Sequence, residues 1–246
     1  MTAPAPEELM AIHLSREVRD GEISACGALS MIPAAGLLLA KHTHAPQADI
    51  LILGSPAFFP FRTSRQFHYL AQRGDLGLFF VSGVQIDQQG NYNLHLLGQD
   101  HDHPDVRFPG GYGGGLIYYA ARRTVVFRTE HSPRVFVEHV DFISAAGVTP
   151  PHMLRLGGPS KVVTPLATLA MDREAGVLKL ESVHPPHTTE AVVAATGFDL
   201  GVTGAAPQTA PPTAEELRVL RAVVRPLMME TGTYPDWAAQ HLAAAG

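Results

Sequence analysis

The chain has 246 residues, 46% of them hydrophobic, and a formal net charge of −5, which is typical of a soluble globular protein. We expect a single domain over residues 1–246. The chain has no basic excess, which argues against nucleic-acid binding, and no apolar run near the ~20 residues of a membrane span. Its one cysteine, Cys26, argues against an internal disulfide and a thiolate metal cluster.

The N-terminal stretch MTAPAPEEL is acidic and lacks the apolar core of a signal peptide, so we expect a cytoplasmic protein. Helices and short apolar runs then alternate along the chain. The sequence predicts helices at 6–19 and 33–42, and strands at 23–29, 50–53, 76–81, 124–127 and 135–137. Apolar runs without alternation are typical of parallel strands covered on both faces. This order predicts an α/β fold, an open, mostly parallel sheet with helices on both faces.

After Gly176 the pattern loosens into Pro-rich turns, at 184–187 and again at 210–213. Thr213 and Glu216 have the spacing of a capping box, and LRVLRAVV follows them. We therefore expect a final amphipathic helix near the C-terminus.

The stretch ADILILGSPAFFPF, residues 48–61, predicts a buried strand that ends in a turn. Ligand sites of open α/β sheets lie just past such strand ends. This turn carries no charged side chain; it offers Leu53, Gly54, Ser55 and then Phe58. Ser55 stands at the strand-to-turn position, but the motif G-x-S-x-G is absent and the sequence marks no histidine as its base.

Three further stretches are candidate sites. QDHDHPD, residues 99–105, combines metal-ligand residue types, but without a rigid scaffold or a distant third ligand we interpret it as a solvated loop and expect no metal. Residues 87–91, DQQGN, predict a hairpin turn with Gly90 at a positive φ. GGYGGG, residues 110–115, precedes a predicted helix and could cradle a phosphate or an oxyanion, or could be a flexible turn.

Five stretches in this order resemble the B-type chain of the class I CoA-transferases, most closely glutaconate CoA-transferase. They are HAPQADILIL, GVQIDQQGNYN, HDHPDVRF with the GGYGGG loop, VDFISAAG and TTEAVVAATGFDL, and the resemblance covers nearly the whole chain. It implies the class I CoA-transferase fold and a partner A subunit that shares the active site, as an A2B2 heterotetramer. It also implies an acyl-CoA substrate, with coenzyme A present only as part of that substrate and no other cofactor.

The resemblance also implies site residues. The transferases attack the thioester with a glutamate, and Leu53 stands at that position here. Leucine has no nucleophile, so the covalent step of CoA transfer cannot run from it. Tyr112 and Ser55 are the predicted catalytic residues, orienting the substrate or relaying a proton, although Tyr112 could instead only fill space. The predicted acyl-CoA-binding residues are Leu53, Gly54, Phe58, Gln85, Gly110, Gly111, Gly113 and Gly114.

Decarboxylation is the activity that we expect first. An unsaturated dicarboxylyl-CoA such as 3-methylglutaconyl-CoA can lose CO₂ to give 3,3-dimethylacrylyl-CoA without a cofactor. The chain resembles the B subunit of the AibA/AibB-type decarboxylase of isovaleryl-CoA biosynthesis. The alternatives are a CoA-ester hydrolase of the ring-opened steroid type, a glutaconate-type transferase with a displaced nucleophile, and a non-catalytic structural subunit.

Overall fold

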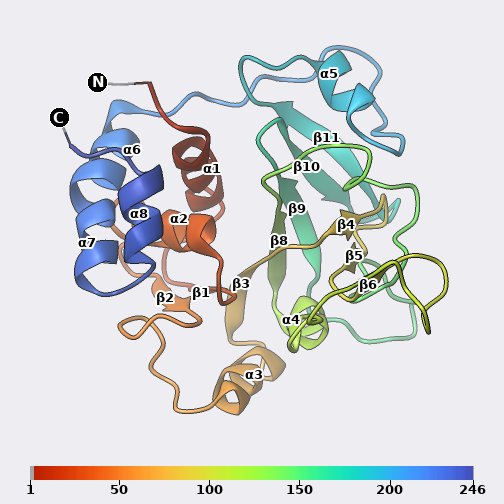
Figure 1. Ribbon diagram of the computed structural model, residues 1–246, viewed down its shortest axis with the longest axis horizontal. Coiled ribbons are helices and arrows are strands. Elements are labelled where there is room, and N and C mark those ends of the chain that lie inside the picture. Colours follow the sequence, from red (N-terminus) through yellow and green to blue (C-terminus); the bar gives the residue numbers. More distant parts are fainter. Residues whose placement is uncertain (1–2, 246) are drawn as a thin grey trace. The chain divides into compact units, whose positions relative to one another are not determined.

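The computed structural model describes residues 3–245 and consists of two compact units (Figure 1). Unit 1 comprises Met1–Leu70, Asp75–Phe80 and Pro211–Gly246. Unit 2 comprises Ala71–Gly74 and Val81–Ala210. The chain crosses between the units four times, and unit 1 holds both its first and its last helices. The single domain expected from the sequence stays a prediction.

Unit 1 contains a parallel sheet in the order β3-β1-β2. The register places Ile23 of β1 opposite Asp49 of β2 and opposite Leu76 of β3. Every residue of β3 is buried, as the apolar run at 76–81 predicts. The other two strands end earlier than expected, at Cys26 and Ile52. The strands are β1 (Ile23–Cys26), β2 (Asp49–Ile52) and β3 (Leu76–Val81).

The helices of unit 1 bury an apolar stripe against one another and against the sheet. Leu37, Leu38 and Leu39 of α2 are at most 1% exposed, and α2 contacts α1, β1 and β2. The helices are α1 (Pro6–Ser15), α2 (Met31–Lys41), α3 (Ser64–Gln72), α6 (Ala214–Val219), the π-helix η1 (Leu220–Val224), α7 (Arg225–Glu230) and α8 (Pro235–His241).

The first helix ends at Ser15, earlier than the predicted end at residue 19. The Ser15 hydroxyl donates back to the Ile12 carbonyl (2.7 Å), a local bond that competes with helix continuation. The capping box predicted at the other end of unit 1 is confirmed. The Thr213 hydroxyl accepts from the Glu216 N–H (3.1 Å), and the Thr213 N–H donates to the Glu216 carboxylate (2.7 Å).

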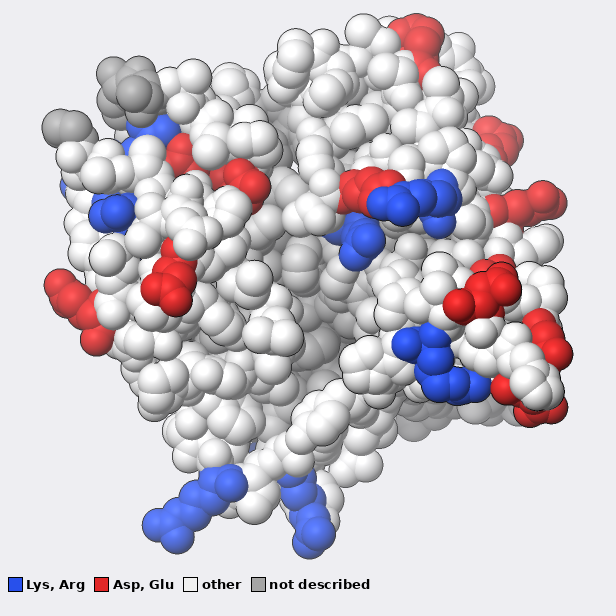
Figure 2. All heavy atoms as spheres, viewed as in Figure 1, with Lys and Arg blue, Asp and Glu red and all other residues white. Residues whose placement is uncertain are grey.

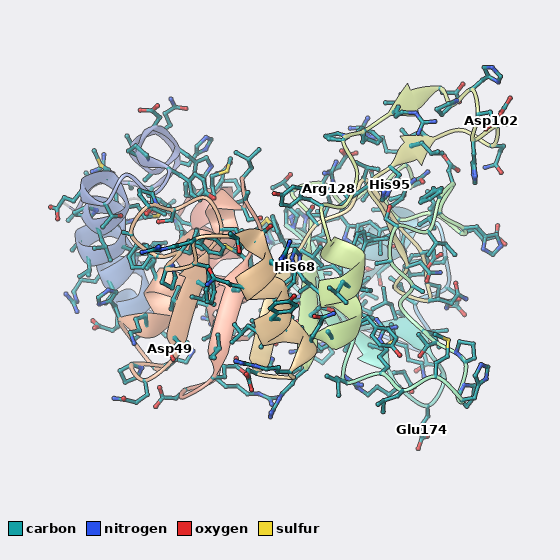
Figure 3. All side chains as sticks on the ribbon, turned by 90° about the horizontal axis from the view of Figure 1, so that it is seen from below. Asp49, His68, His95, Asp102, Arg128 and Glu174 are labelled. Atoms are coloured by element: carbon teal, nitrogen blue, oxygen red, sulfur yellow. The ribbon has the colours of Figure 1, made fainter. Side chains whose placement is uncertain are left out.

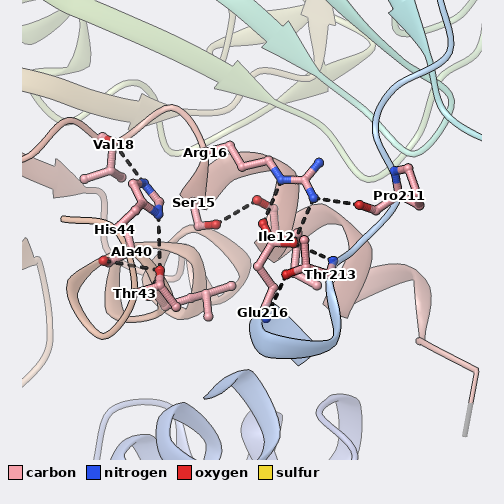
Figure 4. Close-up of polar contacts among 11 residues, drawn as sticks. Ile12, Ser15, Arg16, Val18, Ala40, Thr43, His44, Pro211, Thr213 and Glu216 are labelled. Carbon is pink, nitrogen blue, oxygen red and sulfur yellow. Dashed lines mark hydrogen bonds and ion pairs between the residues drawn. The ribbon is translucent and has the colours of Figure 1, made fainter. Parts of the chain in front are cut away.

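The same glutamate ties α6 to Arg16, the C-cap residue of α1 (Figure 4). Arg16 Nε donates to Glu216 Oε1 and Arg16 Nη2 donates to Glu216 Oε2, both at 2.8 Å. Arg16 Nη2 also donates to the Pro211 carbonyl (2.9 Å). Burial raises the pKa of Glu216, but the hydrogen bonds from Arg16 and Thr213 outweigh it and lower that pKa to about 2. Glu216 thus remains an anion that joins segments far apart in the sequence.

Unit 2 contains a four-stranded sheet region in the order β8-β9-β10-β11. β8 and β9 are parallel, whereas β9 with β10 and β10 with β11 are antiparallel. The mostly parallel sheet with helices expected from the sequence is confirmed. The strands are β8 (Arg123–Phe127), β9 (Pro159–Val163), β10 (Ala167–Asp172) and β11 (Val177–Val183).

Two predictions for this unit are wrong. Residues 135–137 form no strand but a single bridge of Phe136 to Ile86, because the partner strand is only two residues long. The region after Gly176 begins with β11, whose sequence VLKLESV alternates apolar and polar residues at 178–181. That alternation is the signal of a half-buried strand.

The remaining elements of unit 2 are short. The hairpin predicted around Gly90 is confirmed, with a φ of 73° at that glycine and the Gly90 N–H donating to the Asp87 carbonyl (2.9 Å). These elements are β4 (Gln85–Ile86), β5 (Tyr92–Asn93), β6 (Leu96–Leu97), β7 (Val106–Arg107), α4 (Gly114–Ala120) and α5 (Thr189–Ala194).

None of the helices within residues 3–245 is long and apolar enough to cross a membrane. On the face shown in Figure 2, acidic and basic side chains are interspersed rather than gathered by sign.

Candidate functional site

The predicted site residues lie in both units, and the first group surrounds the end of β2. Leu53 follows this strand, and its side chain is partly buried. Its N–H donates to the Cys26 carbonyl (3.2 Å), and its carbonyl accepts from the Tyr234 hydroxyl (3.0 Å). The same hydroxyl accepts from the Leu29 N–H (3.2 Å). Tyr234 therefore fixes the backbone after β1 and after β2 together.

Burial, followed by the neighbouring Cys26 thiol, raises the pKa of Tyr234, so its phenol keeps the proton that it donates to Leu53. Gly54 next to Leu53 has a φ of 85°, which favours glycine. A Cβ at Gly54 would lie 3.7 Å from the Tyr234 oxygen, which is ordinary contact, so the backbone conformation rather than space requires glycine here.

The Ser55 hydroxyl is buried and fully engaged. Ser55 Oγ accepts from the N–H groups of Ala57 (3.3 Å) and Phe58 (3.2 Å) and lies 2.7 Å from Thr233 Oγ1. Thr233 Oγ1 is 2.9 Å from Thr231 Oγ1, whose proton goes to a backbone carbonyl. Because the last hydroxyl donates outward, Thr233 donates to Thr231 and Ser55 donates to Thr233.

The Ser55 proton is therefore committed to this chain of hydroxyls, and the geometry gives Ser55 a structural role. We expect Ser55→Ala to lower the free energy of unfolding by about 1–3 kcal/mol. The N–H groups of Ala57 and Phe58 and the buried hydroxyl of Thr233 would lose the Ser55 hydroxyl as their partner. Urea unfolding followed by the fluorescence of Trp237, the only tryptophan, measures this. Ser64→Ala, at an exposed position, is the control. Unchanged stability would contradict the hydrogen-bond chain.

The aromatic segment after Ser55 is covered in part by its own unit. The rings of Phe59 and Phe61 lie 5.4 Å apart, edge to face, and both contact the buried ring of Phe67 at 6.1 and 6.3 Å. The Phe58 carbonyl accepts from the Ile52 N–H (3.0 Å), which closes the turn. Phe58 itself is partly exposed.

The second group is the glycine loop of unit 2, which forms a tight turn before α4. The Gly114 N–H donates to the Gly111 carbonyl (2.6 Å). Tyr112 has a φ of 42° and Gly113 a φ of 80°, as the two central residues of a type I′ turn require. A left-handed conformation costs a residue such as tyrosine roughly 1–2 kcal/mol. The loop accepts this strain while leaving the Tyr112 side chain 83% exposed.

The positions of this loop are glycine for different physical reasons. A Cβ at Gly114 would lie 2.6 Å from the hydroxyl oxygen of Tyr92, and one at Gly115 would lie 3.1 Å from the Ser144 carbonyl oxygen. A side chain at Gly114 would therefore clash with Tyr92, whereas one at Gly115 would make a tight contact that its neighbour must relax. Gly110, with a φ of 93°, faces the imidazole of His95, and a Cβ there would lie 3.1 Å from Nε2.

His95 is a candidate that the sequence did not single out among the histidines. It follows β5 and is labelled in Figure 3. Its Nδ1 lies 2.5 Å from Ser144 Oγ, which also accepts from the Leu94 N–H (2.7 Å). The ring contacts Phe142 at 4.9 Å. Ser144 and Phe142 belong to the stretch VDFISAAG, so this motif holds the imidazole of His95, two residues after the hairpin stretch.

Gln85 takes part in a framework at the base of the same hairpin. It is buried, and its amide oxygen accepts from Asn93 Nδ2 (2.8 Å) and from the Asp141 N–H (2.9 Å). Its amide nitrogen donates to Asp141 Oδ2 (3.1 Å). Both ends of the Gln85 side chain are used inside unit 2, so the geometry supports a positioning role for it.

The polar loop at 99–105 is built from local turns. Asp100 Oδ1 accepts from the N–H groups of Asp102 (3.0 Å) and His103 (3.1 Å). His101 Nε2 pairs with the Asp141 carbonyl (2.9 Å). Asp102 lies at the periphery of the view in Figure 3, in agreement with an exposed loop.

Comparisons with known proteins agree with this architecture. The family described as Coenzyme A transferase matches residues 59–195. The B subunit of 3-oxoadipate CoA-transferase from Pseudomonas knackmussii is 27% identical, over 91% of this chain and 94% of its own length. The B subunit of glutaconate CoA-transferase from Acidaminococcus fermentans is also 27% identical, over 89% of this chain and 92% of its own length.

Two solved structures share the fold. The decarboxylase AibA/AibB superposes with a TM-score of 0.77 at 23% identity, covering 99% of this chain and 100% of the matched chain. Rhodococcus jostii RHA1 IpdAB superposes with a TM-score of 0.81 at 23% identity, with the same coverage. The IpdB chain of that organism is a cholesterol ring-cleaving hydrolase subunit, 30% identical over 58% of this chain and 57% of its own length.

Proposed function

Because this chain belongs to the coenzyme A transferase family, we propose that it is the B subunit of a heteromeric acyl-CoA decarboxylase. The observation that carries the proposal is the end of β2. Leu53 stands there, and the stretch that follows it, GSPAFFPFRT, contains no carboxylate. Its backbone is held at both its N–H and its carbonyl. An attacking carboxylate is therefore missing at the position where the transferases carry one.

The substrate of this proposal is an unsaturated dicarboxylyl-CoA such as 3-methylglutaconyl-CoA. The bond to the carboxylate breaks, CO₂ leaves, and the electron pair moves through the C=C bond onto the thioester oxygen as a dienolate. A proton then adds to carbon, which gives 3,3-dimethylacrylyl-CoA. An apolar residue at the site favours this step, since the departing carboxylate becomes neutral CO₂. The reaction needs no cofactor besides the coenzyme A of the substrate.

We assign acyl-CoA contacts to Leu53, Gly54 and Phe58 in unit 1, and to the glycine loop in unit 2. The strained and exposed Tyr112 supports a functional loop, because strain persists where the surrounding structure maintains it for a purpose. That both groups serve the same acyl-CoA stays a prediction from the sequence, as do the catalytic role of Ser55 and the acyl-CoA contact of Gln85. The glycines concerned are Gly110, Gly111, Gly113 and Gly114.

A partner A subunit is part of this proposal. The relatives are B subunits of CoA-transferases, which supports a partner chain here. We propose an A2B2 heterotetramer in the cytoplasm. The partly exposed aromatic segment with Phe58 is one surface that such a partner could cover.

Hydrolysis of a ring-opened steroid CoA ester is the second candidate. It is favoured by the likeness to IpdAB, which has a similar fold, and to its IpdB chain, which is 30% identical over part of its length. The product would then have gained water instead of having lost CO₂.

The experiment uses the complex of this chain with its A subunit. The complex is incubated with glutaconyl-CoA, 3-methylglutaconyl-CoA and a ring-opened steroid CoA ester, and the products are weighed by mass spectrometry. Loss of CO₂ supports the proposal, gain of water supports the hydrolase, and CoA exchange with added acetate identifies a transferase. Conversion by exchange alone would overturn the proposal.

Tyr112→Phe tests the glycine loop, since it keeps the ring and removes only the hydroxyl. If the hydroxyl orients the substrate or relays the proton, kcat falls by roughly 10²–10⁴. A space-filling ring predicts kcat within about twofold of the wild type. Tyr69→Phe is the control, because Tyr69 is also exposed but belongs to unit 1. Steady-state decarboxylation by the complex measures both variants, and an unchanged kcat for Tyr112→Phe would exclude the relay.

A further inference from the structure

We propose that His95 is a hydrogen-bond donor, through Nε2–H, to the thioester oxygen of an acyl-CoA bound at the glycine loop. The inference rests on the proposed function for its ligand. It assigns a catalytic residue that lies outside the stretch 48–61 and outside the glycine loop itself. Three structural facts carry it: the hydrogen bond at Nδ1, the position of Nε2 and the packing of the ring.

The first fact concerns the contact at the other ring nitrogen. Ser144 Oγ accepts the N–H of Leu94 at 2.7 Å and lies 2.5 Å from His95 Nδ1. A hydroxyl has a single proton to donate, and among residues 3–245 Nδ1 is its nearby acceptor. With Ser144 as the donor to Nδ1, the ring carries its own proton on Nε2.

The second fact is the position of that N–H group. Nε2 lies against Gly110, where a Cβ would stand 3.1 Å away, and Cε1 lies 3.7 Å from the corresponding position on Gly111. Within the described chain, Nε2 has no hydrogen-bond partner, although the ring is partly buried. Glycine at position 110 leaves this donor uncovered, so an oxygen atom of a ligand on the loop can reach it.

The third fact is that the ring is held in place. Its face packs on Phe142 at a centroid distance of 4.9 Å, and the His95 N–H donates to Asn93 Oδ1 (3.0 Å). Asn93 is fully buried. A donor fixed before the reaction costs no reorganisation when charge develops on the thioester oxygen, and one such donor is typically worth about 10²–10³ in kcat.

The chemistry needs no proton transfer from His95. When CO₂ leaves, the electron pair of the broken bond moves onto the thioester oxygen, and the hydrogen bond from Nε2–H strengthens with that charge. His95 keeps its proton throughout, and the proton that completes the product comes from another donor. A donor of this kind acts on kcat more than on substrate binding.

The alternative is a purely structural role, in which His95 only holds the VDFISAAG segment through Ser144. Two variants separate the roles. His95→Phe keeps a ring on Phe142 but removes the donor, whereas His95→Gln retains a donor N–H group. A donor role predicts that His95→Phe lowers kcat about 10²–10³-fold with KM within about threefold, and that His95→Gln recovers part of it. A packing role predicts no recovery by glutamine. His103→Gln, in the exposed polar loop, is the control.

The closing experiment is nitrogen-15 NMR of the histidine-labelled A/B complex, with the His95 signals assigned from the His95→Phe spectrum. We expect the Nε2–H tautomer, and we expect its Nε2 signal to shift when crotonyl-CoA, an unsaturated thioester without a carboxylate to lose, is added. An Nδ1–H tautomer, an imidazolium or an Nε2 signal unmoved by saturating crotonyl-CoA would overturn the inference. Because crotonyl-CoA cannot be decarboxylated, this result is independent of whether the complex releases CO₂, which tests the proposed function separately.

Discussion

Leu53→Glu is expected to abolish CO₂ release by the A/B complex, with kcat lowered at least about 10²-fold. The backbone of this residue is anchored to Cys26 and Tyr234 by groups that the substitution does not change. The new carboxylate therefore stands at the end of β2 without moving the strand. Two unit charges at ~4 Å repel by about 4 kcal/mol at an effective dielectric constant of about 20, and each 1.36 kcal/mol is about tenfold in rate.

Leu53→Gln is the matched control, since it has the shape of glutamate without the charge. If charge is the cause, the glutamine variant keeps far more activity than the glutamate variant. Equal loss in both would mean that polarity or shape at Leu53, rather than charge, decides the rate.

The glutamate variant also tests the link to the transferases. Borohydride reduces a glutamyl-CoA thioester, so peptide mass spectrometry can detect this covalent intermediate. Treated wild-type protein should show no modified peptide from residues 45–61, whereas traces in Leu53→Glu would indicate restored transferase chemistry. A modified peptide from the wild type would show that the protein is a transferase.

Glu8→Gln is expected to have the largest effect on stability, a loss of about 3–5 kcal/mol in the free energy of unfolding of unit 1. The side chains of Glu8 and Arg221 are 0% and 5% exposed, and two hydrogen bonds of 2.9 and 2.7 Å join them. Glu8 also accepts from the N–H groups of Ala5 (2.9 Å) and Ala243 (3.1 Å). Removing its charge takes the Glu8 carboxylate away from the buried Arg221 guanidinium.

The pH dependence has a definite sign. Burial raises the pKa of Glu8, but the hydrogen bonds from Arg221, Ala5 and Ala243 outweigh it and hold that pKa below its ordinary value. A carboxyl group with a lowered pKa contributes stability fully above its unfolded pKa of about 4.3, and this stability is lost as the pH falls through the folded value. Urea unfolding between neutral pH and pH 3 should therefore show a smaller gap between wild type and Glu8→Gln at the acid end.

A double variant, Glu8→Leu with Arg221→Met, is the control for this pair. Replacing both members of a buried ion pair with apolar residues is often neutral or stabilising, so we expect it to recover most of the loss. If the double variant is as unstable as Glu8→Gln, the helix contact itself, rather than the loss of the Glu8 charge, explains the effect.

Several features could be predicted from local sequence alone. The capping box at Thr213, the turn at Gly90 and the buried strand β3 were predicted correctly, because each depends on residues within a few positions of one another. The resemblance to the transferases was likewise visible in short stretches, and it identified the family. The departure at Leu53 was visible for the same reason, since it is the identity of one residue after one strand.

Tertiary structure decided what depends on residues far apart in the chain. Tyr234 lies 181 positions beyond the Leu53 carbonyl that it binds, and Thr233 lies 178 beyond Ser55. Ser144 is 49 positions beyond His95. Sequence patterns report the period of a strand or the cap of a helix, but they carry no information on which distant hydroxyl completes a hydrogen bond. The position of the His95 ring and the engagement of the Ser55 hydroxyl follow from such pairings, and a hydroxyl's partners determine where its one proton goes.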